Sequence, residues 1–186
     1  MAVWLVRAGK AGEHEAKFLA EKRIYLAWSG LNKDLGKLDT PRSLRAAMAE
    51  VYPDRKSRTI QNWASQIFPF AHSMEVGDLV VLPRKTQSTI AIGTIDGAYT
   101  HLPKGPDPYF HSRKVKWLSE GVPRAHFGQD LLYSFGAFMT ICRIQRNNAE
   151  ARLRAMAANK WAREKAADVM APDLASDSDP GSGAET

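Results

Sequence analysis

Two apolar segments, residues 78–83 and 89–99, limit the architecture of this chain more than any other part of the sequence. Both are rich in Val, Ile and Leu, both have the length of a strand, and turn-forming residues surround them. The five residues that connect them, 84–88, are all polar and begin with Arg and Lys. The pattern therefore predicts two neighbouring strands joined by a short basic loop.

The rest of the chain alternates short strands with helices but lacks the regular strand–helix repeat of a doubly wound parallel sheet. This mixture predicts an α+β fold: a small curved sheet or barrel wrapped by helices, with a C-terminal helix. We expect one folded domain over residues 1–146, an amphipathic helix over 147–170 and a disordered acidic tail or linker over 171–186. The other predicted strands are 2–9, 23–30, 109–118 and 138–145, and the other predicted helices are 12–23, 40–53, 57–68 and 128–138, the last of these a short helix or turn.

Two of these helices carry clear start and stop signals. Thr40 is a typical N-cap residue, and Pro41 suits the first helical position because its missing N–H has no partner there anyway. Ser57 is the predicted cap of the next helix. That helix should end near Phe68, because Pro69 follows and cannot donate a helical hydrogen bond.

The charge distribution points to a polyanionic partner. The chain has 26 Lys and Arg against 20 Asp and Glu, a net charge of +6. Five of the acidic residues lie after residue 167 and no cation does, so residues 1–167 carry a net charge of +11. A body this basic favours binding to nucleic acid.

Composition also bounds the compartment. No apolar run approaches the roughly 20 residues that a membrane-spanning helix needs, and the N-terminus lacks the pattern of a signal peptide. Cys142 is the only cysteine, which excludes a disulfide framework and a cysteine zinc site. We therefore expect a cytoplasmic protein without a membrane partner.

Motifs for catalysis are weak. A PD-(D/E)xK nuclease needs its carboxylates and lysine on neighbouring strands, but Asp54 and Lys56 fall in a predicted turn between helices. The five histidines are not spaced as metal ligands, and no phosphate-binding glycine-rich loop or nucleophile elbow is present. We expect no catalytic residue, no metal and no cofactor.

Candidate binding residues are more numerous. Arg84 and Lys85 open the basic loop, where their side chains suit a phosphate backbone. Arg113 and Lys114 lie on a predicted strand; alternation places Arg113 on the same face as Trp117, where a buried guanidinium needs an acid or a ligand.

The aromatic residues divide into two groups. Trp28 ends a predicted strand and is followed by Ser29 and Gly30, and Tyr109 leaves a proline-rich loop in a similar way. Side chains at such strand ends commonly open onto a pocket, where a ring can stack on an extruded base. The remaining tryptophans follow the apolar periodicity and are expected in the core: Trp4, Trp63, Trp117 and Trp161.

The order of several motifs resembles the PUA-like superfamily, in particular the EVE and YTH domains and the N-terminal reader modules of modification-dependent restriction enzymes of the Mrr and McrB type. The motifs are "IYLAWSGLNKDL", "YPDRKSRTIQNWASQIFPFAHSMEVGDLVVLPRK", "IAIGTIDGAY" and "YFHSRKVKWL". They extend over residues 2–145. The C-terminus departs from those enzymes, because only a helix and an acidic tail follow where they continue into a nuclease or a GTPase motor.

The resemblance implies a PUA-like barrel, a basic face for DNA and an aromatic pocket for a flipped modified base. Together with the residues above, it places Trp28, Ser29, Asn62, Trp63, Tyr109 and His111 at the base pocket, and Arg84, Lys85, Arg113 and Lys114 at the DNA backbone.

The leading hypothesis is a non-catalytic reader of double-stranded DNA carrying a modified base, in a restriction or phage-defence system. Such a reader either stands alone or works with a fused or separate nuclease. The alternatives are an RNA-binding PUA-like protein, a metal-dependent nuclease, and an interaction module whose basic face contacts an acidic protein. The sequence leaves open which modification is read and the oligomeric state.

Overall fold

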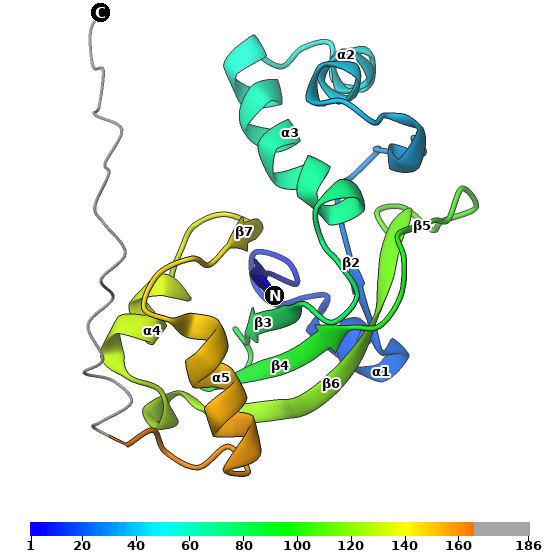
Figure 1. The fold of residues 1–186 in the computed structure, drawn as a ribbon. Coiled ribbons are helices and arrows are strands. Elements are labelled where there is room, and N and C mark those ends of the chain that lie inside the picture. The colour runs from blue at the N-terminus through cyan, green and yellow to red at the C-terminus, as the bar shows by residue number, and fades with distance from the viewer. Residues whose placement is uncertain (166–186) are drawn as a thin grey trace, which may run out of the picture.

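The computed structural model describes residues 1–165 and has an α+β fold, as predicted, in which a curved sheet lies between two groups of helices (Figure 1). The elements follow in the order β1 (Val3–Val6), α1 (Glu15–Glu21), β2 (Arg23–Tyr25), α2 (Pro41–Val51), α3 (Ser57–His72), β3 (Leu79–Pro83), β4 (Thr89–Ile95), β5 (Thr100–His101), β6 (His111–Pro123), α4 (Gln129–Ser134), β7 (Ile141–Arg143) and α5 (Ala149–Ala158). Among residues 1–165, no helix combines the length and the apolar character that a bilayer crossing requires.

The described strands form one sheet in the order β2-β6-β4-β3-β1-β7, with β5 paired to β6. The pair β1 and β3 is parallel, and the other pairs are antiparallel. The two apolar segments of the sequence thus contain the central strands β3 and β4, joined by the basic loop 84–88 as predicted, but β4 ends at Ile95 and not at residue 99.

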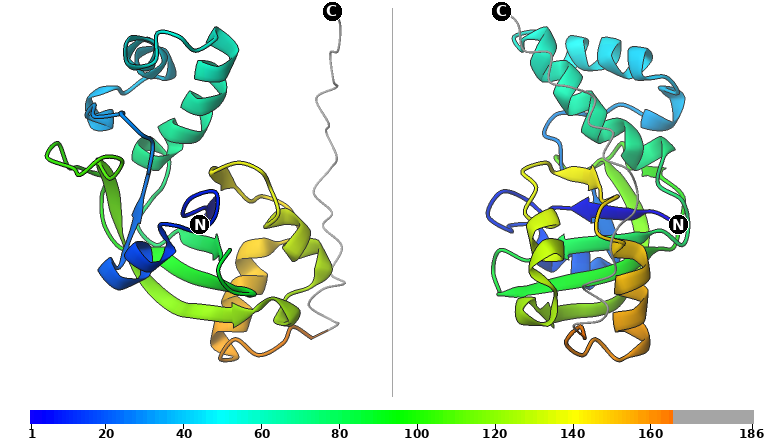
Figure 2. Two further views of the ribbon diagram at one scale, coloured as in Figure 1. Left: turned by 180° about the vertical axis from the view of Figure 1, so that it is seen from behind. Right: turned by 60° about the vertical axis from the view of Figure 1, so that its left-hand side comes forward.

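The sheet bends along β6, which pairs with β2 and β5 near its start and with β4 further on (Figures 1 and 2). The register between β4 and β6 shifts twice around Ile92, which is typical of β-bulges that curve a sheet. Gly93 makes the close approach possible, because a Cβ at this position would lie 2.6 Å from a methyl group of Val115 and 2.9 Å from the Trp117 ring. The result is an open half-barrel.

Both faces of the central strands are covered, so their side chains are buried without alternation. Trp4 and Val6 of β1 belong to a core shared with α1, α2 and α3. Val3 and Leu5 point the other way, into a second core with α4 and α5. The first group of helices positions the candidate site described below.

The helix α2 begins as predicted: Thr40 and Ser43 form a reciprocal capping box, and Pro41 is the first helical residue. The prediction that the next helix ends near Phe68 is wrong, because α3 continues through Pro69 to His72. Proline removes one hydrogen bond from the last turn, but this turn buries Phe70 completely against the core.

Two other helix limits also differ from the prediction. Ser57 is the first residue of α3 rather than its cap; Lys56 occupies the cap position and makes no side-chain cap hydrogen bond. The C-terminal helix α5 ends at Ala158 and not at 170, because Lys160 and Trp161 adopt left-handed backbone angles that a helix cannot continue through. Residues 166–170 and the predicted tail 171–186 lie outside the described residues.

The segment that follows α5 returns to α4 through an ion-pair network. The buried Arg152 guanidinium contacts Asp130 at 2.6 Å and Glu164 at 3.0 Å. Asp130 lies in the first turn of α4, so the network fixes α4, α5 and residue 164 to one another. Hydrogen bonds from Arg152 lower the pKa of Asp130, which keeps this carboxyl group charged.

Candidate functional site

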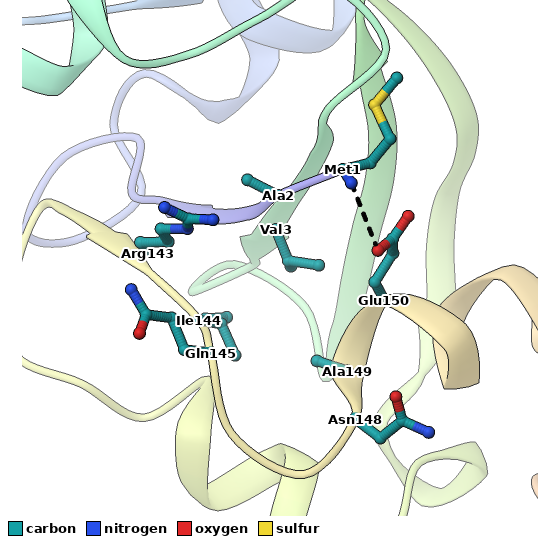
Figure 3. Close-up of a pocket in the computed structure, with 9 residues that line it drawn as sticks. All are labelled: Met1, Ala2, Val3, Arg143, Ile144, Gln145, Asn148, Ala149 and Glu150. Atoms are coloured by element: carbon teal, nitrogen blue, oxygen red, sulfur yellow. Dashed lines mark ion pairs between the residues drawn. The ribbon is translucent and has the colours of Figure 1, made fainter. Parts of the chain in front are cut away.

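Two surface depressions near the N-terminal strand differ in what they can bind. One, about 420 Å³ in volume, lies beside the chain terminus, where the Met1 ammonium is 3.6 Å from the Glu150 carboxylate (Figure 3). None of its lining residues is aromatic. It offers hydrogen-bonding groups and charges but no flat apolar surface, so it is a weaker candidate than the second depression.

The second depression has a volume of about 640 Å³ and is called the aromatic pocket below. Four large aromatic side chains line it: Trp28, Tyr52, Trp63 and Phe138. They come from four separate parts of the chain, namely the segment after β2, the C-terminal end of α2, the helix α3 and the segment before β7. Only the fold brings them together.

Trp63 is the centre of the aromatic wall. Its ring meets the Trp28 ring edge-to-face at a centroid distance of 5.6 Å, and it meets the Tyr52 ring in the same way at 5.3 Å. The Tyr52 hydroxyl donates to the carbonyl oxygen of Ser29. Burial, with a smaller contribution from Asp107, raises the pKa of Tyr52 to about 12, so this hydroxyl remains a donor at neutral pH.

The turn that carries Trp28 is held from the proline-rich loop. Gly30 adopts a left-handed φ of +79°, and its N–H donates to Asp107 at 2.9 Å. The Ser29 hydroxyl donates to the other oxygen of the same carboxylate at 3.4 Å. Trp28 is therefore fixed in the wall of the pocket, in a turn beyond the end of β2 at Tyr25 and not at the end of a strand as predicted.

The pocket is positively charged. Arg7, Lys10, Arg55 and Lys85 line it against one carboxylate, that of Glu13. Backbone hydrogen bonds lower the pKa of Glu13, which therefore stays ionised. The excess of cations favours an anionic ligand, or one with an anionic group near its ring.

The four cations of the aromatic pocket differ in their contacts. The Arg7 guanidinium donates to the carbonyl oxygens of Phe135 and Ala137, and so it fixes the segment that carries the fully exposed Phe138. The Arg55 guanidinium lies 5.4 Å from the centre of the Trp63 ring, a cation–π distance. Lys10 and Lys85 are exposed at the pocket.

Glu15 holds the basic loop that follows β3. This carboxylate is only 2 % exposed and accepts hydrogen bonds from the Arg84 guanidinium, the Lys85 backbone N–H and the Thr86 hydroxyl at 2.7–3.0 Å. Burial raises the pKa of Glu15, but these hydrogen bonds outweigh it and hold the pKa below its ordinary value. The Arg84 charge is thus neutralised within the protein, whereas the Lys85 side chain remains exposed at the pocket.

Of the predicted base-pocket residues, Trp28, Ser29 and Trp63 meet at the aromatic pocket. Asn62 precedes Trp63 on α3 but does not line the pocket; its side-chain oxygen accepts from Gln66. Tyr109 lies behind one wall, where its hydroxyl is 2.6 Å from Nδ1 of His14, a residue that lines the pocket.

His111 lies in the interior, fully buried and away from the pocket. Its Nε2 is 2.6 Å from the carbonyl oxygen of Leu31, so the proton is on Nε2. Its Nδ1 accepts from the Tyr99 hydroxyl at 2.6 Å, and the Tyr99 oxygen accepts in turn from the Leu35 N–H. These residues form a satisfied internal chain that joins β6 to the segment after β2.

Two residues of β6 predicted to contact the DNA backbone, Arg113 and Lys114, also lie away from the aromatic pocket. The Arg113 guanidinium is buried and donates to the carbonyl oxygens of Phe70, Met74 and Gly97. Lys114 is exposed on the strand but lines neither depression. We therefore leave His111, Arg113 and Lys114 out of the site proposed below.

Three residues of the aromatic pocket were not predicted from the sequence: Tyr52, Arg55 and Phe138. Tyr52 and Arg55 carried a weak signal, because Tyr52 is near the end of a predicted helix and Arg55 lies in the turn that follows it. Phe138 carried no such signal, because an aromatic residue at the start of a predicted strand is expected in the core. Within residues 1–165, no three His, Cys, Asp or Glu side chains gather closely enough to hold a metal ion.

Comparison with known proteins gives a family but no activity. No curated protein matches the sequence significantly. A solved structure of a hypothetical protein from Leishmania major aligns with a TM-score of 0.40 and 9 % sequence identity, over 86 % of this chain and 96 % of that chain. A family model described as a domain of unknown function, DUF8426, matches residues 4–131, which is most of the described fold, and the chain belongs to this family.

Proposed function

We propose that this protein is a non-catalytic nucleic-acid reader that accepts an unstacked, modified base of duplex DNA in the aromatic pocket. The observation that carries the proposal is the pocket itself. It joins an aromatic wall around Trp63 to a rim of cations, the pairing that single bases and their phosphates require.

In this proposal the two sets of residues do different work. Trp28, in the pocket wall, stacks on the extruded base, which contributes roughly 1–3 kcal/mol per stacked base. Lys10 and Lys85 neutralise the neighbouring phosphates. Phosphate contacts carry no information about base identity, so discrimination between modified and unmodified DNA rests on the aromatic wall.

The architecture supports the same proposal. A small curved sheet with helices on both faces is compatible with a PUA-like barrel, which is the finer fold assignment that we propose. The open half-barrel also leaves the segment after β2 free to form one side of the pocket instead of continuing the sheet.

A binding panel tests the proposed function. Duplexes of one sequence, unmodified or carrying 5-methylcytosine, 5-hydroxymethylcytosine or N6-methyladenine, are titrated with the full chain, alongside single-stranded RNA of the same sequence. We expect one modified duplex to bind more tightly than the unmodified one, and log affinity to fall linearly with log salt concentration.

Equal affinities for all duplexes would contradict the reader function, and tighter binding to RNA would favour the RNA-binding alternative. A further arm incubates the best duplex with the protein and Mg²⁺ or Mn²⁺, where we expect no cleavage. Cleavage that disappears in Asp54→Asn would instead support a nuclease.

A further inference from the structure

A second basic depression lies between α2 and α3. It has a volume of about 720 Å³. Three arginines line it, Arg42, Arg45 and Arg55, and small or apolar side chains of the two helices, Ala46, Ala49 and Ile60, form the rest of the wall together with Ser57. We call this depression the arginine groove.

The arginines of the groove have no acidic partner among residues 1–165. Arg42, Arg45 and Arg55 take part in none of the ion pairs or side-chain hydrogen bonds of this part of the chain. Glu50 is the acid that α2 itself contains, and its carboxylate lies 3.8 Å from the Lys33 ammonium instead. Other arginines of the protein are satisfied internally, as Arg84 is by Glu15.

The backbone positions of the three arginines place their side chains around the groove. Arg42 and Arg45 are three residues apart on α2, so they lie on one side of the helix. Arg55 belongs to the turn between the helices, where its backbone N–H donates to Tyr52. Three like charges around one groove repel each other in the free protein, and a bound anion relieves that repulsion.

The N-terminus of α3 adds hydrogen-bond donors to the arginine groove. Ser57 lines the groove and is the first residue of the 16-residue helix α3. The cap residue of this helix makes no side-chain hydrogen bond, so its first backbone N–H groups are free of a side-chain cap. The positive end of the helix dipole therefore adds to the arginine charges.

We propose that the arginine groove binds phosphate groups of the same nucleic-acid strand whose base enters the aromatic pocket. Arg55 connects the two sites, because it lines both and lies over the Trp63 ring. The planar guanidinium fork matches two phosphate oxygens at once. This inference rests on the proposed function and moves the main backbone contact from the loop 84–88 to the helices.

The test compares Arg42→Ala/Arg45→Ala with a matched control, Lys114→Ala/Lys116→Ala. Both double variants remove two exposed or partly exposed cations, but the control residues lie on β6 and line neither the groove nor the aromatic pocket. Arg55 is left unchanged because it touches both sites. Alanine is the best helix former, so α2 should keep its stability, which thermal melting verifies.

Duplex binding is measured over a range of salt concentrations. We expect the slope of log affinity against log salt to become less steep by about 1.8 in the groove variant, about 0.9 for each lost phosphate contact. The control should keep the wild-type slope. The ratio of affinities for modified and unmodified duplexes should stay at its wild-type value in both variants, because the aromatic pocket is intact.

A groove variant with the wild-type slope, or a control that loses as much as the groove variant, overturns the inference while leaving the base pocket untouched. If the wild type binds modified and unmodified duplexes equally, but its salt slope still becomes less steep in the groove variant, the reader function alone is overturned. No duplex binding by the wild type overturns both. Inorganic tripolyphosphate is titrated as a competitor: displacement of the duplex by an equimolar amount would assign the groove to a small polyphosphate instead.

Discussion

His111 shows how one buried residue makes the stability of the whole protein depend on pH. Burial lowers its pKa to about 4 from an ordinary value of 6.5. The unfolded chain therefore binds a proton between pH 6.5 and 4 that the folded chain does not bind. The His111 contribution to stability is complete above pH 6.5 and is lost as the pH falls towards 4, a change of about 3 kcal/mol.

Replacement of His111 by Gln should remove this dependence. The variant is expected to be less stable than the wild type at pH 7, but the difference in the free energy of unfolding should shrink by about 3 kcal/mol at pH 4. Urea unfolding of both proteins at a series of pH values measures this difference in the free energy of unfolding. Two curves that stay parallel between pH 7 and 4 would show that His111 does not titrate as its burial implies.

Arg113 illustrates what single residues reveal in the sequence. Alternation along the strand predicts that Arg113 shares a face with Trp117 and needs a partner, and this face is indeed buried at Arg113 and Val115. The partners are backbone carbonyl oxygens of Phe70, Met74 and Gly97. Every residue has a backbone carbonyl group, so the sequence cannot show which of them accept hydrogen bonds from Arg113. The sequence therefore predicts an acid or a ligand, and only the tertiary structure identifies the acceptors.

At the scale of elements, Glu15 fastens the helix α1 to the loop between β3 and β4. We expect Glu15→Gln to destabilise the protein by roughly 3 kcal/mol or more, because it leaves the Arg84 guanidinium without its partner in a largely buried position. Glu21→Gln is the matched control: Glu21 also lies on α1, but its side chain is 43 % exposed and its pair with Lys17 contributes little. The Gln amide oxygen can still accept the hydrogen bond that Glu21 receives from the Tyr25 hydroxyl.

Chemical denaturation measures both variants, and amide hydrogen exchange of residues 84–88 reports on the loop itself. Faster exchange in Glu15→Gln alone is the expected result. Equal stability of the two variants would mean that the loop is held by its strands and that Glu15 is dispensable.

Element by element, local patterns predict the centre of the fold better than its limits. The strands β3 and β4 and the start of α2 follow from apolar runs and caps, which are signals of neighbouring residues. The end of α3 beyond Pro69 depends on core packing at Phe70. Tertiary contacts also limit the prediction of the aromatic pocket. Trp28 and Trp63 can be predicted from the sequence, whereas Phe138 reaches the pocket because Arg7 holds the neighbouring backbone.

For the whole molecule, the distribution of charge sets the strength of binding to a polyanion. Residues 166–186 contain five acidic residues and no cation, so a chain that ends at residue 165 has a net charge of +11 instead of +6. We expect the shortened chain to bind duplex DNA more tightly at low salt, with the difference disappearing at high salt as screening increases.

Fluorescence anisotropy at two salt concentrations measures this effect for both chain lengths. A variant of the full chain in which the five acids are replaced by Asn or Gln also has a net charge of +11 and should behave like the shortened chain. If shortening leaves the affinity at low salt unchanged, the acidic residues do not influence the basic surface.

The most direct measurement of the central claim compares Trp28→Ala with wild type for the preferred modified duplex and its unmodified counterpart. Tyr133→Ala serves as the control, because Tyr133 is exposed and does not line the aromatic pocket. We predict that Trp28→Ala lowers affinity for the modified duplex by the worth of one stacked base, roughly 1–3 kcal/mol, and erases the preference while keeping the salt slope. A Trp28→Ala protein that still prefers the modified duplex, whatever its melting temperature, would contradict the base pocket.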